Sequence, residues 1–511
     1  MRTEILLTAL LAALPVVFSC GQKPATDLPA ASALSGYDAG SARAVKPLKP
    51  TGATLMGAGV ELDPHFFSQN VTRKEGVKAQ DWDKFIEPRI KAMKPSRFRM
   101  MVLPHWWEPE NDNDDPQVMA PDGFTFESTE MKSLCRILDL AEEEGIDVTL
   151  VLWGCPISAT SIDRGYLGRH FLCDPEGRNW VCAPASNEEF AENFAALVKY
   201  LVNERNYSCI KEITPFNEPD GGPVCDLPQY IPLVRELDRR FDKEGLRGRV
   251  RFNLSDNTDT RRFFLSTVSE ALFDEADLFN SHTYIFGYDT PNSAILNWER
   301  ANVAAAAGLP HIVGEFGSNQ CVGATRQRDI DRYERGVLMT RLAICFLNGG
   351  ASAISYWSLL DQYYNRDAGY GEMQQLGLWK ANKESYRYDE NDYAAAEGDY
   401  LVRPQYYAYG LLTRFVRKGM RVYPLDLGRS LAAGTALRGK DGKWVYIFAN
   451  GTQESLSFDL KGRGTCRAYI YSQDSLPQGD SQIEASCRLA SDSGAWHLAL
   501  APQTTLVLAQ D

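Results

Sequence analysis

Short apolar runs alternate with longer amphipathic stretches from residue 51 to residue 415. Most of the runs are separated by a segment with apolar residues at three- and four-residue spacing, which predicts an amphipathic helix. The clearest of these helices are predicted at 131–145, 190–204 and 227–245. The predicted strands are ATLMGAGVEL, SRFRMMVLP, DVTLVLWG, EITPFNEP, VRFNLSD, ADLFNSHTY, HIVGEFGS and SAISYWSLL.

Eight strands that alternate with helices predict an α/β fold, a (β/α)8 TIM barrel. An open, doubly wound parallel sheet is the alternative arrangement of the same elements. That fold commonly places a Gly-rich phosphate loop after its first strand, and no such loop follows ATLMGAGVEL. The pattern therefore favours the barrel.

The pattern changes on both sides of the predicted barrel, which spans 51–415. Residues 21–50 are rich in Pro, Ala, Gly and Ser and lack periodicity, so they predict a disordered linker. The last barrel helix is predicted at 404–416. Residues 416–511 contain short alternating strands and turn signals such as Asn450-Gly451. They predict a C-terminal antiparallel β-sandwich domain.

Residues 1–20 predict a bacterial lipoprotein signal peptide. Arg2 precedes an apolar run, residues 5–19, that is shorter than the roughly 18 residues of a membrane-spanning helix and is followed by Cys20. Residues 17–20, VFSC, resemble a lipoprotein cleavage box, which implies that Cys20 carries the lipid in the mature chain. A plain secretory signal is the alternative. Since Asp does not follow Cys20, the resemblance implies the outer membrane of the cell envelope, with either side possible.

Charge and composition limit the classes of ligand and cofactor that the chain is expected to bind. A net charge of -13 without clustered Lys and Arg argues against nucleic acid and favours a neutral or weakly charged ligand. The sequence has neither a CxxC pair nor a Cys/His cluster with zinc spacing, so no metal and no cofactor are predicted. In an exported protein the candidate disulfides join Cys173 to Cys182 and Cys466 to Cys487.

Two glutamates follow apolar strand runs at positions that face each other across the predicted barrel. Glu218 follows the fourth predicted strand and Glu315 lies near the end of the seventh. The carboxyl ends of barrel strands form the working face of this fold. Two carboxyl groups placed there can flank a sugar, one to protonate the leaving oxygen and one to attack the anomeric carbon.

Asn217-Glu218-Pro219 at strand four, with Glu315 at strand seven, resembles clan A of the retaining glycoside hydrolases, which includes families five, thirty and thirty-nine. The resemblance covers the predicted barrel, residues 51–413. It implies that Glu218 is the acid/base and Glu315 the nucleophile of a double-displacement reaction. It also implies that Asn217 hydrogen-bonds the sugar 2-hydroxyl.

Further residues resemble the substrate-binding positions of the same clan. Arg99 resembles the strand-two Arg that hydrogen-bonds the nucleophile, and its charge would keep that carboxylate ionised. His282 and Tyr284 resemble the pair at strand six, and Trp357 resembles the aromatic residue at strand eight. Each also has a structural interpretation: an ion pair for Arg99, and core packing for the other three.

Aromatic and acidic residues gather after the second and third predicted strands. Trp107 and Trp153 are candidate stacking surfaces for sugar rings, although core packing is an equally good explanation for such residues. The acidic run EPENDNDD, residues 108–115, is expected to be a solvated loop that disfavours anionic glycans.

These observations predict an exported, lipid-anchored retaining glycoside hydrolase that cleaves β-linked oligo- or polysaccharides. A glycan-binding lipoprotein on a silent hydrolase barrel is one alternative, and the retention of both glutamates argues against it. A transglycosylase using the same residues is the other. The sugar, the linkage, exo or endo action and the oligomeric state stay open.

Overall fold

The structure, a computed structural model, describes residues 28–31, 34–67, 81–120, 122–156, 169–177, 181–221, 224–261, 263–318, 329–363, 373–380 and 400–511. Cys20 and the rest of the predicted signal peptide lie outside these residues. Across the described ranges, no helix has both the length and the apolar character needed to cross a membrane.

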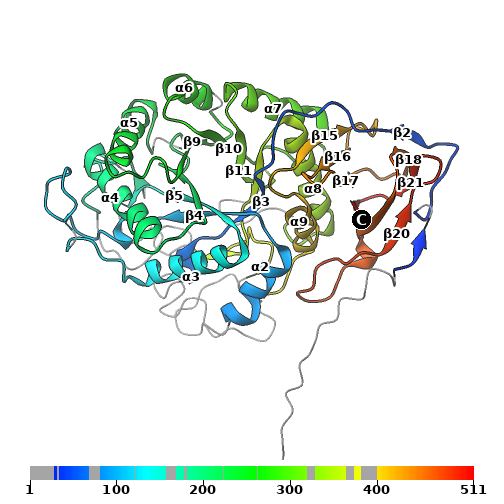
Figure 1. Ribbon diagram of the computed structural model, residues 1–511, viewed down its shortest axis with the longest axis horizontal. Coiled ribbons are helices and arrows are strands. Elements are labelled where there is room, and N and C mark those ends of the chain that lie inside the picture. Colours follow the sequence, from blue (N-terminus) through cyan, green and yellow to red (C-terminus); the bar gives the residue numbers. More distant parts are fainter. Residues whose placement is uncertain are drawn as a thin grey trace, which may run out of the picture.

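Eight parallel strands form a closed barrel, which confirms the predicted fold (Figure 1). The strands are β3 (Gly57–Glu61), β4 (Arg97–Val102), β5 (Asp147–Leu152), β8 (Ile210–Thr214), β9 (Arg251–Asn257), β10 (Leu278–Thr283), β11 (His311–Phe316) and β12 (Ala353–Tyr356). The following helices are α2 (Glu87–Met93), α3 (Thr129–Glu144), α4 (Asn187–Lys199), α5 (Leu227–Lys243), α6 (Phe263–Ala271), α7 (Asn292–Ala305), α8 (Tyr333–Gly349) and α9 (Pro404–Phe415). The barrel closes where β12 pairs with β3.

Local signals set the helix boundaries. α3 begins after Ser128, whose hydroxyl accepts a hydrogen bond from the Met131 N–H (3.1 Å). It ends at Gly145, whose φ of 66° is the left-handed conformation that suits glycine. The helix predicted at 190–204 corresponds to α4 and its continuation, the π-helix η4 (Tyr200–Glu204).

The barrel interior carries charged side chains in two layers. Arg97 and Arg99 lie two residues apart on β4, so their side chains are on the same face of the strand, the one that points into the barrel. Arg97 Nη2 donates to Thr149 Oγ1 (3.0 Å) and to Glu212 Oε2 (2.5 Å). Arg99 lies one layer closer to the carboxyl ends of the strands. Barrel interiors are usually filled by branched apolar residues, so this charged layer at the working face points to function.

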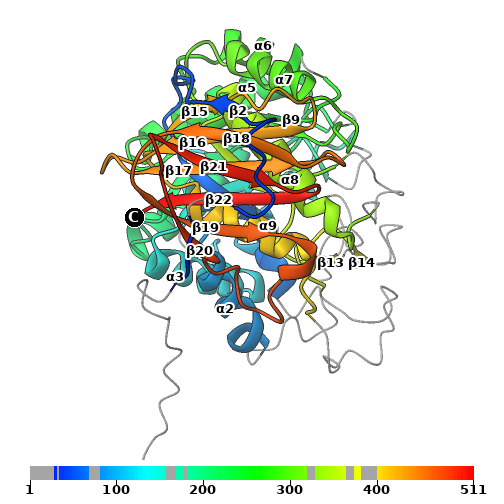
Figure 2. The same cartoon turned by 90° about the vertical axis from the view of Figure 1, so that its right-hand side faces the viewer.

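The C-terminal domain consists of two sheets that share an apolar core (Figure 2). The larger sheet contains β1 (Ala30–Ala31), β20 (Cys487–Ala490), β19 (Thr465–Tyr471), β22 (Thr504–Gln510), β17 (Trp444–Asn450), β16 (Ala432–Arg438) and β15 (Arg421–Leu425), in that order. The smaller sheet contains β2 (Arg43–Val45), β18 (Leu456–Lys461) and β21 (Ala495–Leu500). All pairs except those of β1 and β2 are antiparallel.

The expectation of a disordered linker at 21–50 is wrong for its described part. β1 and β2 each add a short parallel strand to an edge of a sheet in the C-terminal domain. The Tyr37 hydroxyl donates to Asp459 (2.6 Å), and Arg43 pairs with Asp426 (2.8 Å). Two- and three-residue strands are too short to show a periodic pattern, and their partners lie more than 380 residues away.

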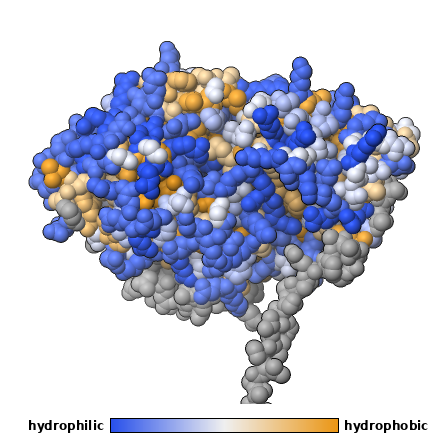
Figure 3. Space-filling model, viewed as in Figure 1, coloured by the Kyte–Doolittle hydropathy of each residue, from blue (hydrophilic) through white to orange (hydrophobic). Residues whose placement is uncertain are grey.

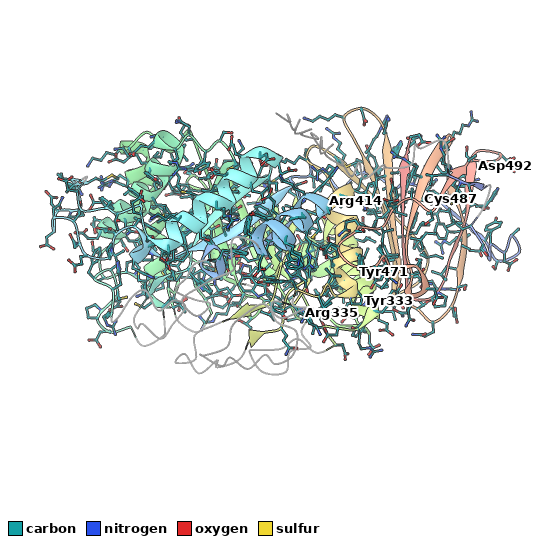
Figure 4. The ribbon with its side chains drawn as sticks, turned by 90° about the horizontal axis from the view of Figure 1, so that it is seen from below. Tyr333, Arg335, Arg414, Tyr471, Cys487 and Asp492 are labelled. Carbon is teal, nitrogen blue, oxygen red and sulfur yellow. The ribbon has the colours of Figure 1, made fainter. Side chains whose placement is uncertain are left out.

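Tyr333 and Tyr471 join the barrel to the C-terminal domain. α8 and α9 lie between the barrel strands and the larger sheet (Figure 1), and the two tyrosines meet at this junction (Figure 4). Their rings stack with centroids 4.6 Å apart, and the Tyr471 hydroxyl donates to the Tyr333 carbonyl (2.7 Å). The Tyr333 hydroxyl donates to the carbonyls of Tyr471 (3.1 Å) and Gln503 (2.7 Å).

The predicted disulfides are not formed in the structure. Cys173, Cys182, Cys466 and Cys487 are all free thiols. On the paired strands β19 and β20, Cys466 lies opposite Leu489 and Cys487 lies opposite Ala468, so the two cysteines do not face each other. Cys173 and Cys182 are neighbours, and a hydrogen bond with Cys182 together with burial raises the pKa of the Cys173 thiol.

The molecular surface is mainly hydrophilic in the view of Figure 3, with hydrophobic residues confined to smaller areas. The large apolar side chains that are exposed among the described residues are separated along the chain: Leu48, Val118, Phe263, Phe273, Ile285 and Leu401.

Candidate active site

Glu218 lies at the mouth of the barrel, in the turn that follows β8. Its φ of 42° is a left-handed conformation that residues other than glycine rarely adopt. The Glu218 N–H donates to the Asp256 carbonyl (3.2 Å), and the Asn217 N–H donates to the Leu152 carbonyl (2.9 Å). Contacts to two neighbouring strands thus hold a strained turn, a feature that clusters at functional positions. The Glu218 side chain is 34% exposed.

Glu315 lies within β11 and is far more enclosed, with 6% of its side chain exposed. Arg99 Nη1 donates to its Oε1 (2.6 Å), and the Tyr284 hydroxyl donates to its Oε2 (2.7 Å). Both carboxylate oxygens therefore accept a strong hydrogen bond, which fixes the orientation of the group.

His282 lies between the two glutamates. Its Nδ1 is 2.8 Å from Glu218 Oε1 and 3.4 Å from Glu315 Oε2. One oxygen of each glutamate and this nitrogen all lie within 4.8 Å of one another. The fold therefore brings together the two carboxyl groups that the sequence predicted to face each other.

Arg99 connects the carboxyl ends of four other strands. Besides Glu315, its guanidinium donates to Glu61 Oε2 (3.0 Å), Asn217 Oδ1 (2.8 Å) and Asp256 Oδ2 (2.6 Å). The predicted contact between Arg99 and Glu315 is present, and it is one of four. Because Arg99 is 3% exposed, these acceptors replace the water that its charge would otherwise bind.

Asp256 links Arg99 to His282. Its Oδ1 is 3.2 Å from His282 Nε2. Burial disfavours the charged form of both side chains, but their surroundings outweigh it. The negative charges of Glu315 and Asp256 raise the pKa of His282 well above its usual value. The positive charges of Arg99 and His282 lower the pKa of Asp256 to about 2. His282 is therefore an imidazolium that donates from both ring nitrogens, to Glu218 and to Asp256.

Burial has a larger effect on Glu315 than its cationic neighbours. The charges of His282 and Arg99 act to lower its pKa, as expected for Arg99, but burial outweighs them and raises the pKa above that of an ordinary carboxyl. Arg99 therefore acts in the expected direction, toward the ionised form of Glu315, but its charge does not outweigh burial. The charge of Glu315 depends on Arg99 and His282 together.

Glu61 and Asp63 were not among the predicted site residues. They follow the apolar residues of β3, and the Met101 N–H donates to Asp63 Oδ1 (2.9 Å). Burial raises the pKa of Glu61 well above its usual value and that of Asp63 to about 6. Like Asp256, both lie at the carboxyl end of a barrel strand. The signal that identified Glu218, a carboxylate directly after an apolar strand run, is present at all three positions.

The tryptophans predicted to bind substrate are largely buried. Trp107 is completely buried, and its indole N–H donates to the Asn193 carbonyl (2.8 Å), so in this structure it packs in the core. Trp153 is 4% exposed and Trp357 is 8% exposed. Little of these last two rings is open to a ligand.

Glu218, His282 and Glu315 are the set of potential metal ligands that lie within 4.8 Å of one another in the described chain. A metal requires a neutral ring nitrogen from histidine. Negative neighbours instead raise the pKa of His282, and its Nδ1 lies at hydrogen-bonding distance from Glu218. The donor set therefore fits a proton-bridged cluster better than a metal centre.

No family model and no curated protein matches this chain. Solved structures, however, share its fold. The catalytic domain of GH30 xylanase C from Talaromyces cellulolyticus has a TM-score of 0.61 at 14% identity, covering 92% of this chain and 100% of that chain. A GH30 endoxylanase from Clostridium papyrosolvens C71 has a TM-score of 0.59 at 13% identity, covering 92% and 100%.

A GH51 arabinofuranosidase from Xanthomonas axonopodis pv. citri has a TM-score of 0.57 at 11% identity, again covering 92% of this chain and 100% of that chain. Because 92% coverage of this chain exceeds the share of the barrel alone, the likeness extends to the C-terminal domain. The chain therefore shares the fold of these solved structures, and at such identities the likeness establishes the fold alone.

Replacing Asp256 with Asn should lower the pKa of His282. The substitution keeps the shape of the side chain and removes one of the two negative charges that raise this pKa. The His282 imidazolium would then lose a ring N–H proton and become neutral at a lower pH than in the parent protein. NMR titration of the protein labelled with ¹⁵N-histidine measures the change, with the His282 signal assigned from its loss in His282→Gln.

Asp459→Asn is the matched control, because Asp459 contacts His497 in the C-terminal domain (2.7 Å). It should leave the titration of His282 unchanged. An unchanged His282 titration in Asp256→Asn would contradict the role assigned to Asp256.

Proposed function

We propose that the chain is a retaining glycoside hydrolase that cleaves β-linked glycans, with Glu218 as acid/base and Glu315 as nucleophile. The observation that carries the proposal is the placement of one oxygen from each glutamate within 4.8 Å of the other at the mouth of the barrel. Retaining enzymes hold their carboxyl groups about 5–5.5 Å apart, whereas inverting enzymes leave roughly 6.5–9.5 Å for a water.

The surroundings of the glutamates suit two different roles. In the first step Glu315 attacks the anomeric carbon while Glu218 gives its proton to the leaving oxygen. In the second step Glu218 takes a proton from water, whose oxygen displaces Glu315 from the sugar. Glu218 Oε1 accepts from His282, which leaves Oε2 to carry the transferred proton.

Positive neighbours suit Glu315 to the role of nucleophile. Arg99 Nη1 lies 2.6 Å from Glu315 Oε1, and His282 Nδ1 lies 3.4 Å from its Oε2. Positive charges at these distances favour the ionised form that attacks the anomeric carbon.

The substrate proposal rests on Asn217 and on the shared fold. Asn217 Oδ1 accepts from Arg99, which orients the amide so that its Nδ2 can donate to a sugar 2-hydroxyl. The similar structures include two that are described as xylanases. A β-linked polysaccharide is therefore the proposed substrate class.

We also propose that Cys20 carries a lipid that attaches the protein to the outer membrane. Support comes from the sequence, in which the apolar run at 5–19 ends directly before Cys20. A lipid on this residue would supply the hydrophobic anchor.

The glutamates should differ in their response to alanine substitution. Glu218→Ala should lower the rate on unactivated oligosaccharides by about 10²–10⁴-fold, the usual contribution of a general acid. It should lose much less on aryl glycosides, whose leaving groups depart without a proton. Glu315→Ala should lose turnover on both kinds of substrate. Steady-state rates on a panel of β-linked polysaccharides, oligosaccharides and aryl glycosides measure both effects.

Asp441→Ala, in an exposed turn of the C-terminal domain, is the control and should retain activity. Small and equal losses of rate in Glu218→Ala and Glu315→Ala would contradict the assigned roles. Binding without cleavage across the panel would favour a silent glycan-binding barrel, and transfer to added sugar acceptors would favour a transglycosylase.

Hydrolysis of a β-linked substrate should first release the β-anomer. Two successive displacements at the anomeric carbon restore its configuration, as expected for carboxyl groups this close. Proton NMR of the product during the first minutes, before mutarotation, measures the anomer. Initial formation of the α-anomer would contradict the retaining mechanism.

Cys20→Ser should release the protein from membranes. The substitution removes the thiol that would carry the lipid, so the exported chain should move from the membrane to the soluble fraction of a bacterial host. Fractionation and labelling with radioactive palmitate measure the change, with Cys135→Ser as the control. Equal membrane recovery and equal labelling of the two variants would contradict the anchor.

A further inference from the structure

Glu61 and Asp63 form a pair of buried carboxyl groups beside the candidate active site. Glu61 is the last residue of β3 and is 1% exposed, and Asp63, two residues later, is completely buried. One oxygen of each group has a donor: Glu61 Oε2 accepts from Arg99 Nη1 (3.0 Å), and Asp63 Oδ1 accepts from the Met101 N–H (2.9 Å). The other two oxygens, Glu61 Oε1 and Asp63 Oδ2, are buried and meet no donor among the described residues. A buried carboxylate oxygen without a donor is costly, so the two need a common explanation.

A proton shared between the two groups supplies the missing donor. The side chains of Glu61 and Asp63 lie within hydrogen-bonding range of each other. An ionised carboxylate only accepts hydrogen bonds, whereas a protonated carboxyl group also donates one through its O–H. Two ionised groups would therefore repel each other across this contact. One proton turns the contact into an O–H···O hydrogen bond that uses both remaining oxygens.

The surroundings place this proton on Glu61. Burial and the negative charge of Asp63 raise the pKa of Glu61 well above its usual value, although the charge of Arg99 opposes the change. Burial raises the pKa of Asp63 only to about 6, because hydrogen bonds to its ionised form limit the rise. At neutral pH Asp63 is therefore the carboxylate and Glu61 the donor. Arg99 tolerates a neutral Glu61 because Glu315 and Asp256 also form ion pairs with it.

We propose that Glu61 donates a shared proton to Asp63, and that the two act as positioning residues that direct the charge of Arg99 to the nucleophile Glu315. Their role in the reaction rests on the proposed function, whereas the shared proton does not. Arg99 Nη1 donates to both Glu61 Oε2 and Glu315 Oε1, at 3.0 Å and 2.6 Å. When Glu61 is neutral, Glu315 is the ionised one of these two acceptors. The negative charge of the pair then lies on Asp63, whose described hydrogen bonds do not include one to Arg99.

The proton on Glu61 affects the pH at which Glu315 ionises. Because both carboxyl groups bond to one nitrogen, they lie within the roughly 4–6 Å over which a neighbouring charge shifts a carboxyl pKa. Burial already raises the pKa of Glu315, and a negative charge on Glu61 would raise it further. A neutral Glu61 therefore lets Glu315 ionise at a lower pH. The other titratable and charged groups that act on Glu315 are His282, Arg99, Glu218 and Tyr284, and those that act on the pair from other strands are Arg99 and Glu315.

Two isosteric substitutions distinguish the two possible positions of the proton. In Glu61→Gln the amide NH₂ can donate to Asp63 Oδ2 while the amide oxygen accepts from Arg99, so this variant reproduces a protonated Glu61. In Asp63→Asn the amide oxygen must accept from the Met101 N–H, which turns the NH₂ group toward Glu61. Glu61 must then accept a hydrogen bond, and it does so as the carboxylate. Both variants keep the shape of the side chain and satisfy each hydrogen bond of the pair, so they should fold.

Infrared spectroscopy at neutral pH tests the shared proton without reference to activity. The C=O stretching band of protonated carboxyl groups should lose intensity in both Glu61→Gln and Asp63→Asn relative to the parent protein. Asp441→Asn, which removes a carboxyl group from an exposed turn of the C-terminal domain, is the control and should leave the band unchanged. An unchanged band in either Glu61→Gln or Asp63→Asn would overturn the shared proton.

The pH profile of kcat/KM on a β-linked substrate tests the role of the pair, because its acid limb reports the ionisation of the nucleophile in the free enzyme. Asp63→Asn should move this limb to higher pH by about one unit or more, since it ionises Glu61. Glu61→Gln and Asp441→Asn should leave the pH of the limb in place.

The remaining outcomes separate the parts of the proposal. Movement of the acid limb to lower pH in Glu61→Gln, without movement in Asp63→Asn, would place the proton on Asp63 and overturn the assignment to Glu61. Equal acid limbs in all variants would overturn the action of the pair on Glu315. Loss of the infrared band in both variants of a protein that cleaves no substrate would support the shared proton and contradict the proposed function.

Discussion

The Arg99 guanidinium is the group on which the candidate site depends. It lies buried in the barrel, and its four acceptors come from β3, β9, β11 and the segment that follows β8. A buried guanidinium charge is stable only when nearby carboxylates compensate it, and removing a partner from such a buried pair is strongly destabilising. The interaction that organises the barrel mouth therefore also sets the positions of Asn217 and Glu315.

A second cation, His282, extends this centre to Glu218. Asp256 lies between the two cations and accepts a hydrogen bond from each of them. Its negative charge therefore stabilises the positive charges of both Arg99 and His282. In the layer below, Arg97 forms a buried ion pair with Glu212. Two layers of ion pairs thus replace much of the apolar filling usual in such barrels. The lower layer ends at Arg251, which pairs with Glu212 and is 44% exposed, whereas the upper one ends at the partly exposed Glu218 at the mouth of the barrel.

The barrel could be predicted from sequence because each of its strands carries a local apolar signal. All of the predicted strands are present. The rule that carboxyl ends of strands meet predicted that Glu218 and Glu315 lie together, and the resemblance to clan A added Arg99, His282 and Tyr284. Glu61, Asp63 and Asp256 obey the same rule but belong to no motif that drew attention to them. The burial of Trp107 and the pairing of β2 could not be read from local sequence for another reason: both depend on partners that are distant in sequence.

Exposure distinguishes the two glutamates, and with them their proposed roles, more sharply than charge does. An acid/base must give a proton to a departing group and take one from incoming water, so it needs contact with changing partners. Glu218, one-third exposed and held through one oxygen by His282, meets that need. A nucleophile must keep a fixed approach to the anomeric carbon. Glu315 is held through both oxygens and shielded from solvent. If the roles were exchanged, the proton carrier would have to break bonds to Arg99 and Tyr284 in every cycle. The geometry therefore supports the assignment of Glu218 as acid/base independently of any motif.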